Sequence, residues 1–553
     1  MIIFIFRKEK EVKFTMANMN FNKKIFFGGN IITVNPLQPI AEAVGIIDEK
    51  ITAVGELEEV KKNMGKNIET IDLNGKTLLP GFIDSHIHPI LFLFFFLNLD
   101  LSKIRSLKEL QDLLKETVEN KKPREWIFGL SLKEENFDIP KLPTRWDLDL
   151  VSPDNPIFLL RYDGHIGIAN SMALEFANIN IDTVPPEGGE IRKNENGELT
   201  GVLSETALPF ISSKISFPNP DEIKATSSEV FQVLASKGIT SVHGIVQMEK
   251  GGELGNLGGI EIPILKTIID KVLQNWYLMI SAINPKKIKR IKKPPLDEGK
   301  EDGKFKVNCL KLFADGTFGA ATACMFEPFS DQPEKIGFLV IDEEALYNRM
   351  KIAHNLGFQI AIHAIGDKGN KIVVDLYKRL LKEFPRKDHR HRIEHASMLT
   401  SDVIKDMKEL GLICSSQPPF INSEYTWLEK RLGKQRCKYT YPLKSVVDAD
   451  VVFTAGSDCP VEDPDVILGL HALVNRNGFI PEECLSMEEA LKAYTINGAF
   501  AAFEENIKGS LEPGKLADLV ILNKNPLEVS KDQIKEIQVI ETIIRGKTVY
   551  KKK

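Results

Sequence analysis

Residues 79–88 have the sequence Leu-Pro-Gly-Phe-Ile-Asp-Ser-His-Ile-His, an apolar run that ends in two histidines. Such a run predicts a buried strand, and residues two apart on a strand project from the same face. His86 and His88 would then present two imidazoles side by side at the strand end. Imidazole is the commonest protein ligand for zinc and related ions, so the pair predicts part of a metal site. The alternative is that both are ordinary structural or surface histidines.

Seven further apolar runs have the length of buried strands, and each leads to a polar residue that could serve a reaction. They are 156–160, followed by Arg161, Asp163 and His165; 238–242, before His243; 305–312, with Lys311 and then Asp315; 358–362, before His363; 392–394, before His395; 412–416, before Gln417; and 451–455, followed by Asp458. Stretches of helical spacing separate most of these runs, and alternation of strands and helices predicts parallel pairing. Eight such units predict an α/β fold, a (β/α)8 TIM-like barrel with its active site at the C-terminal strand ends.

A length of 553 residues predicts at least one domain beside the barrel. Short alternating strands at both chain ends predict a small β-sandwich domain built from residues 22–78 and 505–553. The barrel is expected over residues 79–504, with insertions at about 103–155 and 170–230 near the active-site face. Residues 1–21 are expected to be a disordered N-terminal tail.

The composition limits the classes of partner and compartment. The net charge is −5, from 77 acidic and 72 basic residues, which gives no reason to expect nucleic acid or an anionic membrane as partner. The apolar block at 90–97 is shorter than the ~20 residues that a membrane span needs. Six cysteines without a CxxC motif are typical of reduced thiols, so we expect a cytoplasmic protein. A small-molecule substrate is expected, and the assembly could be a homodimer.

Several of these motifs together resemble a known family. Residues 77–88 resemble the first-strand signature of the amidohydrolase superfamily, and residues 509–520 resemble its closing signature. The segments 161–165, 311–316, 363–367, 393–396 and 456–460 lie between them. This set is similar to amidohydrolase family 3, the branch that includes N-substituted formamide deformylase. The resemblance runs from about residue 22 to the end of the chain.

The resemblance implies a metal ligand at each of six positions. His86 and His88 would bind the more buried ion together with Asp458, and His363 and His395 would bind a second ion. Lys311 occupies the position where binuclear members carry a carboxylated lysine, so CO2 would form a carbamate there. The alternative is an ordinary lysine in a salt bridge beside a single ion. Zinc is the default metal for histidine and carboxylate ligands, and manganese, iron or cobalt also fit.

The resemblance also implies the reaction, which is hydrolysis of a carbon–nitrogen bond other than a peptide bond. The substrate would be an amide or an N-substituted formamide, attacked by a metal-activated hydroxide. Asp458 would carry the proton from the attacking water to the leaving amine. His165, or with less support His243, would stabilise the developing oxyanion. The phenylalanines at 94–96, close behind His88, suggest an apolar N-substituent.

Three other functions are open at this point. A lactone or ester hydrolase of the same superfamily would share the two-metal core. A mononuclear deaminase usually has a glutamate three residues after the fifth-strand histidine, where this chain has Gly366. A non-enzymatic scaffold protein would be expected to have lost metal ligands, and this chain keeps all six.

Overall fold

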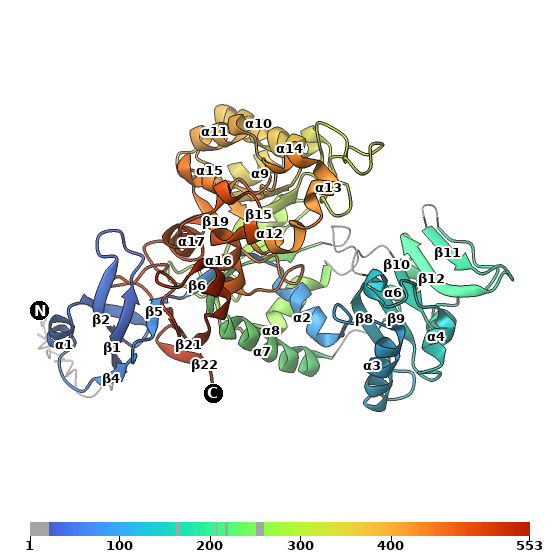
Figure 1. Cartoon of the computed structure of the whole chain (residues 1–553), viewed down its shortest axis with the longest axis horizontal. Coiled ribbons are helices and arrows are strands. Elements are labelled where there is room, and N and C mark those ends of the chain that lie inside the picture. The colour runs from blue at the N-terminus through green and yellow to red at the C-terminus, as the bar shows by residue number, and fades with distance from the viewer. Residues whose placement is uncertain (1–21, 162–165, 187–188, 206, 216–218, 250–258) are drawn as a thin grey trace, which may run out of the picture.

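The structure is a computed structural model that describes residues 22–161, 166–186, 189–205, 207–215, 219–249 and 259–553. Within these residues the strands form three separate sheets (Figure 1). In Figure 1 the sheet built from the chain ends and the sheet of residues 99–205 lie on opposite sides of the barrel. The predicted tail, residues 1–21, lies outside the described residues.

The central sheet is a nearly closed parallel barrel of eight strands. In spatial and sequence order these are β6 (Phe82–Ile87), β13 (Ile239–Gln247), β14 (Asn275–Ser281), β15 (Phe305–Phe313), β16 (Gln359–Ala364), β17 (Arg392–His395), β18 (Ile413–Ser416) and β19 (Phe453–Ala455). The strands are rich in apolar residues because both faces of a parallel sheet are covered. The gap between β19 and β6 is bridged just beyond β19, where the N–H of Asp458 donates to the carbonyl of His86 over 2.7 Å.

Helices follow most barrel strands and cover the outside of the barrel. They are α7 (Pro220–Ser236), α8 (Glu261–Ile268), α9 (Glu343–Asn355), α10 (Asp367–Glu383), α11 (Ser401–Leu410), α12 (Pro419–Glu424), α13 (Leu428–Leu432), α14 (Lys434–Cys437), α15 (Leu443–Asp448), α16 (Val466–Val474), α17 (Met487–Ala493) and α18 (Ile496–Ala501). Their ends follow local chemistry. The side chain of Asn219, for example, accepts from the N–H groups of Asp221 and Glu222 and so begins α7 with Pro220 in its first turn. The expected alternation of strands and helices is therefore confirmed for the barrel.

One predicted barrel strand is wrong, and one barrel strand was missed. The run at 156–160 becomes β9 (Ile157–Arg161), which belongs to a six-stranded sheet outside the barrel. The missing third barrel strand is β14, an apolar run that ends at Ser281. The run at 156–160 was misassigned because the polar residues after an apolar run do not determine which sheet the run joins. β14 was missed because it contributes no metal-binding side chain.

The six-stranded sheet has the order β11-β12-β10-β9-β8-β7. Its other strands are β7 (Leu99–Asp100), β8 (Ile127–Leu132), β10 (Ile166–Ala169), β11 (Gly189–Lys193) and β12 (Leu199–Glu205), with helices α3 (Leu107–Glu119), α4 (Arg145–Asp149), α5 (Ser171–Phe176) and α6 (Pro209–Ser212) beside them in sequence. This sheet approaches the barrel mouth. Its strand β7 packs near α2 (Pro89–Leu97), the helix that begins directly after His88.

Strands from both chain ends combine in one sheet with the order β22-β21-β20-β5-β1-β2-β3 and with β4 paired to β1. They are β1 (Lys23–Ile32), β2 (Ile40–Ile47), β3 (Lys50–Gly55), β4 (Glu69–Asp72), β5 (Thr77–Pro80), β20 (Leu519–Leu522), β21 (Val539–Ile544) and β22 (Lys547–Lys551), and α1 (Leu57–Met64) packs near β2 and β3. A sandwich of two facing sheets is not confirmed, because these strands form a single hydrogen-bonded sheet. None of the helices among the described residues is long and apolar enough to cross a membrane.

Candidate metal centre

The predicted ligand side chains meet at the C-terminal end of the barrel, because parallel strands all end on that side. They lie on β6, β15, β16 and β17 and directly after β6 and β19. The ring centroids of His86 and His395 are 4.9 Å apart, and those of His363 and His395 are 4.3 Å apart. His88 follows β6, at the start of α2 (Pro89–Leu97), and its ring lies 5.7 Å from that of His86. Residues distant in sequence thus form one cluster.

Three of these residues bring ligand atoms close enough to share one ion. One ligand atom each from His86, His395 and Asp458 lies within 4.8 Å of the others, and all three side chains are buried. Oδ1 of Asp458 is 3.4 Å from Nε2 of His86 and 3.2 Å from Nε2 of His88. Nε2 of His86 and Nδ1 of His395 are buried without a hydrogen-bond partner among the described residues.

These open nitrogens test whether the residues fit a metal ion. A buried polar atom without a partner carries an energetic penalty, which a coordinated cation would remove. Neutral imidazole and an ionised carboxylate are ligands of zinc and of its first-row neighbours. The residues present therefore fit a divalent cation.

The backbone around Asp458 explains how its carboxylate is aimed. Asp458 has a left-handed φ of 62°, and its N–H donates to the His86 carbonyl. Gly456 lets this segment approach β6, since a Cβ there would lie 2.5 Å from the backbone nitrogen of His86. Burial raises the pKa of Asp458, but His86 and His88 outweigh burial and hold it well below its usual value. Asp458 is therefore ionised at neutral pH.

Lys311 and His363 form the second half of the cluster. Lys311 is buried, with its Nζ 4.7 Å from the ring centroid of Phe313. Burial, and after it the charge of Lys311, lowers the pKa of His363 to about 3. Nε2 of His363 lies 3.2 Å from the carbonyl oxygen of Gly316, and donation to that oxygen leaves Nδ1 as the nitrogen able to bind a metal. The described residues whose ligand atoms converge are His86, His395 and Asp458, and His363 does not join that group.

Two histidines were predicted to stabilise an oxyanion. His165 lies outside the described residues, and the run 156–160 before it is β9, which belongs to the six-stranded sheet and not to the barrel. His243 on β13 is buried, and its Nδ1 lies 2.8 Å from Nη1 of Arg392. This contact makes His243 a hydrogen-bond partner of a buried arginine.

Glu394 is the site residue that sequence reasoning missed. Its Oε2 forms a hydrogen bond with Nδ1 of His86, and both side chains are fully buried. A signal was present in the sequence, because Arg392 and Glu394 place opposite charges two residues apart in a strand predicted to be buried. Charged side chains in such a strand need a specific partner.

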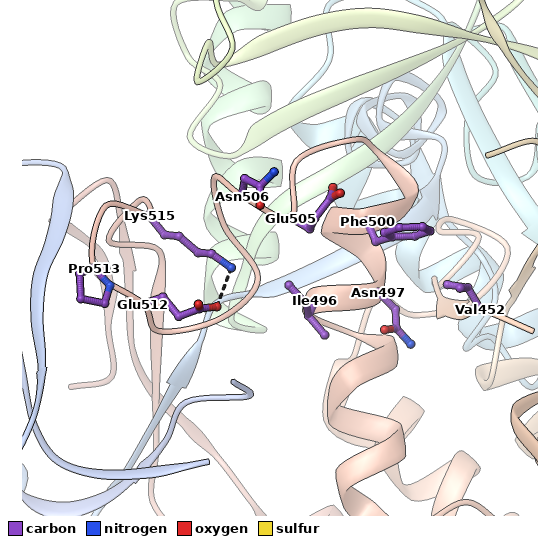
Figure 2. A pocket seen from close by; sticks show the side chains of 9 residues that line it. All are labelled: Val452, Ile496, Asn497, Phe500, Glu505, Asn506, Glu512, Pro513 and Lys515. Atoms are coloured by element: carbon purple, nitrogen blue, oxygen red, sulfur yellow. Dashed lines mark hydrogen bonds and ion pairs between the residues drawn. The ribbon is translucent and has the colours of Figure 1, made fainter. Parts of the chain in front are cut away.

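A cavity of about 550 Å³ lies away from this cluster, between the start of β19 and the segment 505–515 (Figure 2). Its charged lining is already paired. Figure 2 shows Lys515 beside Glu512, with Nζ 2.8 Å from Oε1, and Glu505 binds Arg390 at 2.9 Å. Val452 at its edge precedes β19, whereas Asp458 follows that strand. The cavity is thus separate from the candidate metal centre.

Comparison with known proteins identifies the class of protein. Residues 69–550 match the model of the Amidohydrolase family. The chain is 30% identical over 547 residues to the Bacillus subtilis protein YtcJ, covering 96% of this chain and all of YtcJ. It is also 27% identical to the N-substituted formamide deformylase of Arthrobacter pascens, covering 96% of this chain and 98% of the deformylase.

A solved structure agrees over nearly the whole chain. An uncharacterized metal-dependent hydrolase of Pyrococcus horikoshii superposes with a TM-score of 0.73 at 27% identity, covering 92% of this chain and 99% of that one. The chain therefore belongs to the amidohydrolase family, as its motifs predicted. It is a metal-dependent hydrolase, an enzyme of the class that acts on carbon–nitrogen bonds other than peptide bonds.

Proposed function

We propose that the protein hydrolyses a small-molecule amide, and specifically an N-substituted formamide. The observation that carries this proposal is the convergence of His86, His395 and Asp458, with ligand atoms within 4.8 Å of one another at the active end of the barrel. The formamide is supported by the similarity to the Arthrobacter pascens deformylase, at 27% identity.

The proposed ligand set has two halves. His86, His88 and Asp458 would hold one ion, His363 and His395 the second, and Lys311 would lie between them. A divalent cation here supplies a Lewis acid that polarises a carbonyl group and lowers the pKa of water from about 15.7 toward 7. Zinc is the proposed metal, and manganese, iron or cobalt would suit the same ligands.

The chain's own part in the reaction is proton transfer and orientation. Asp458 is ionised and fixed by its backbone, so it can take a proton from water and return it to the leaving amine. His165 is the proposed hydrogen-bond donor to the developing oxyanion.

Carboxylation of Lys311 is proposed together with the second ion. A protonated lysine repels a dication, but burial favours the neutral amine, which can react with CO2 to form an anionic carbamate. Lys311 is 1% exposed, as that chemistry requires. A carbamate oxygen could then bind either ion.

An apolar substituent on the amide nitrogen is proposed from α2. This helix begins directly after His88 and is almost entirely apolar. The rings of Phe92 and Phe96 meet edge to face at 5.1 Å, and Phe96 is 40% exposed. An exposed aromatic ring on the helix that begins at the site can contact an apolar group. A homodimer, a cytoplasmic location and the lack of nucleic acid or membrane partners remain predictions.

The test is metal content combined with a substrate comparison. The full-length protein is treated with chelator, resupplied with zinc and assayed for metal per chain, and its intact mass is measured for the ~44 Da of a carbamate. Formate release from aromatic N-substituted formamides is then compared with hydrolysis of lactones and esters of similar size. We expect two ions per chain and preferential formamide hydrolysis. No bound zinc, or cleavage of the esters alone, would contradict the proposal.

A further inference from the structure

Beneath the candidate metal centre, a buried polar network joins four barrel strands. It consists of Ser85 on β6, His243 on β13, Arg392 and Glu394 on β17, and Ser415 on β18. All five side chains are at most 1% exposed. A network of this kind in a barrel interior needs a reason, because apolar residues could fill the same space without desolvating charges.

The centre of the network is an ion pair within one strand. Nε of Arg392 lies 2.7 Å from Oε1 of Glu394. Replacing a buried ion pair by apolar residues is often neutral or even stabilising, so stability alone does not account for this pair. Its second carboxylate oxygen, however, is directed at a predicted metal ligand.

That second oxygen, Oε2 of Glu394, accepts from two groups. The hydroxyl of Ser415 donates to it over 2.8 Å, and Nδ1 of His86 forms the other hydrogen bond. An ionised carboxylate can only accept, so Nδ1 of His86 must carry the proton. In the neutral ring this leaves the lone pair on Nε2, the nitrogen that lies 3.4 Å from Asp458.

Arg392 is itself held from three further sides. Its Nη2 donates to the Ser85 carbonyl over 2.7 Å and to Ser415 Oγ over 2.8 Å, and its Nη1 lies 2.8 Å from Nδ1 of His243. The guanidinium therefore cannot swing away from Glu394 without losing contacts to β6, β13 and β18. The carboxylate is fixed in turn.

We propose that Glu394 is a positioning residue of the metal centre, which sets the tautomer and ring orientation of His86 while Arg392 and Ser415 hold the carboxylate in place. This inference rests on the proposed function, since it assigns His86 as a ligand. Carboxylate partners of metal-binding histidines typically affect metal affinity by about 10- to 100-fold.

The test measures zinc affinity of the full-length protein, by competition with a chromogenic chelator. Glu394→Gln keeps the size of the side chain but has one acceptor oxygen and adds an NH2 group, which must face either Arg392 or His86. We expect the apparent Kd for zinc to rise about 10- to 100-fold. The milder Ser415→Ala variant retains the ion pair but loses the hydroxyl that bonds both Arg392 and Glu394, and loss of the bond to Glu394 should raise the Kd about fivefold.

The control is Glu504→Gln, which breaks another buried ion pair. Glu504 binds Lys508 at 2.8 Å, with both side chains almost fully buried, and contacts no candidate ligand among the described residues. This variant should lower thermal stability and leave the zinc Kd unchanged. The visible absorption spectrum of the cobalt-substituted protein should change in Glu394→Gln and Ser415→Ala, and stay as in the wild type in Glu504→Gln.

The outcomes separate this inference from the function on which it rests. A raised Kd and altered cobalt spectrum in Ser415→Ala support it even if Glu394→Gln fails to fold. Wild-type zinc affinity and cobalt spectrum in Ser415→Ala, and in Glu394→Gln where that variant folds, would overturn it while leaving the metal centre intact. A wild-type protein that binds no zinc after resupply would overturn the proposed function, and this inference with it.

Discussion

Histidines gather at both ends of the barrel, and of these two clusters the C-terminal one has buried ring nitrogens without a hydrogen-bond partner in the part of the chain that the structure describes. At the N-terminal end, Nδ1 of His354 is 2.9 Å from Nε2 of His391, and Nδ1 of His391 accepts from the N–H of Ile360. Nε2 of His354 forms a hydrogen bond with the carbonyl oxygen of Phe384, and Nε2 of His389 with that of Leu410, both at 2.9 Å. Nδ1 of His389 accepts from the N–H of His391.

The C-terminal cluster is equally buried but differs in its hydrogen bonds. Nε2 of His86 and Nδ1 of His395 have no hydrogen-bond partner among the described residues, and the Asp458 carboxylate lies beside them. Burial and proximity of imidazoles therefore do not distinguish a metal site from a structural cluster. Buried ring nitrogens without a hydrogen-bond partner, in residues that converge with a carboxylate, do distinguish them.

The largest expected effect comes from Asp458, which lies in the C-terminal cluster and has no counterpart among the N-terminal histidines. Asp458→Asn keeps the side-chain size but cannot accept a proton, so kcat should fall by about 10³-fold or more. The measurement is kcat on the best substrate, with circular dichroism and metal content to verify the fold and the loaded centre. Turnover within tenfold of the wild type, with metal bound, would mean that the proton is carried by another group.

The second-largest expected effect is a loss of folding stability as pH falls. It should come from the N-terminal cluster of His354, His389 and His391. Burial lowers the pKa of His389 to about 4, and it also lowers the pKa of His354 and His391. Below the usual histidine pKa of about 6.5 the unfolded chain binds protons that the folded chain excludes. The contribution of these three histidines to the free energy of unfolding should thus be complete above pH 6.5 and be lost toward pH 4, by about 3 kcal/mol for His389 alone.

Denaturant unfolding of metal-free protein at pH 7 and pH 4.5 measures this loss. A His389→Gln variant provides the control, since it removes the titrating ring and should show a smaller difference between the two pH values. An identical difference in variant and wild type would show that other groups titrate.

Much of the site could be predicted from local sequence because ligand positions are tied to strand geometry. His86 and His88 are two residues apart at a strand end, and parallel strands bring the ends of β6, β16, β17 and β19 to one side of the barrel. Neither inference needs knowledge of packing.

The errors concern features that depend on which segments pair. β9 and β14 are both short apolar runs, and only their neighbours, β8 and β10 for one and β13 and β15 for the other, assign them to different sheets. The role of Glu394 likewise depends on contact with His86, 308 residues earlier in the chain. The strands of the two chain ends were expected to form a small β-sandwich, yet β20 pairs with β5 edge to edge within a single sheet.

The proposed role of His165, stabilisation of the oxyanion, can be tested by substitution. If it donates to the oxyanion, His165→Ala should lower kcat by about 10²-fold with little change in KM. The matched control is His471→Ala on α16, a buried histidine outside both clusters, which should retain kcat. Wild-type kcat in the His165 variant would remove that residue from the proposed mechanism.

The smallest expected effect is the most direct test of the comparison, because His391→Ala and His395→Ala delete the same atoms from opposite barrel ends. His391→Ala leaves the buried Nδ1 of His354 and the N–H of Ile360 without their partner, whereas Nδ1 of His395 has none to lose. Metal-free His391→Ala should therefore unfold with about 2 kcal/mol less free energy than His395→Ala. Zinc content should change in the opposite sense, with full loading retained in His391→Ala and lost in His395→Ala. Equal stabilities, or equal zinc contents, would show that open nitrogens do not separate the two clusters.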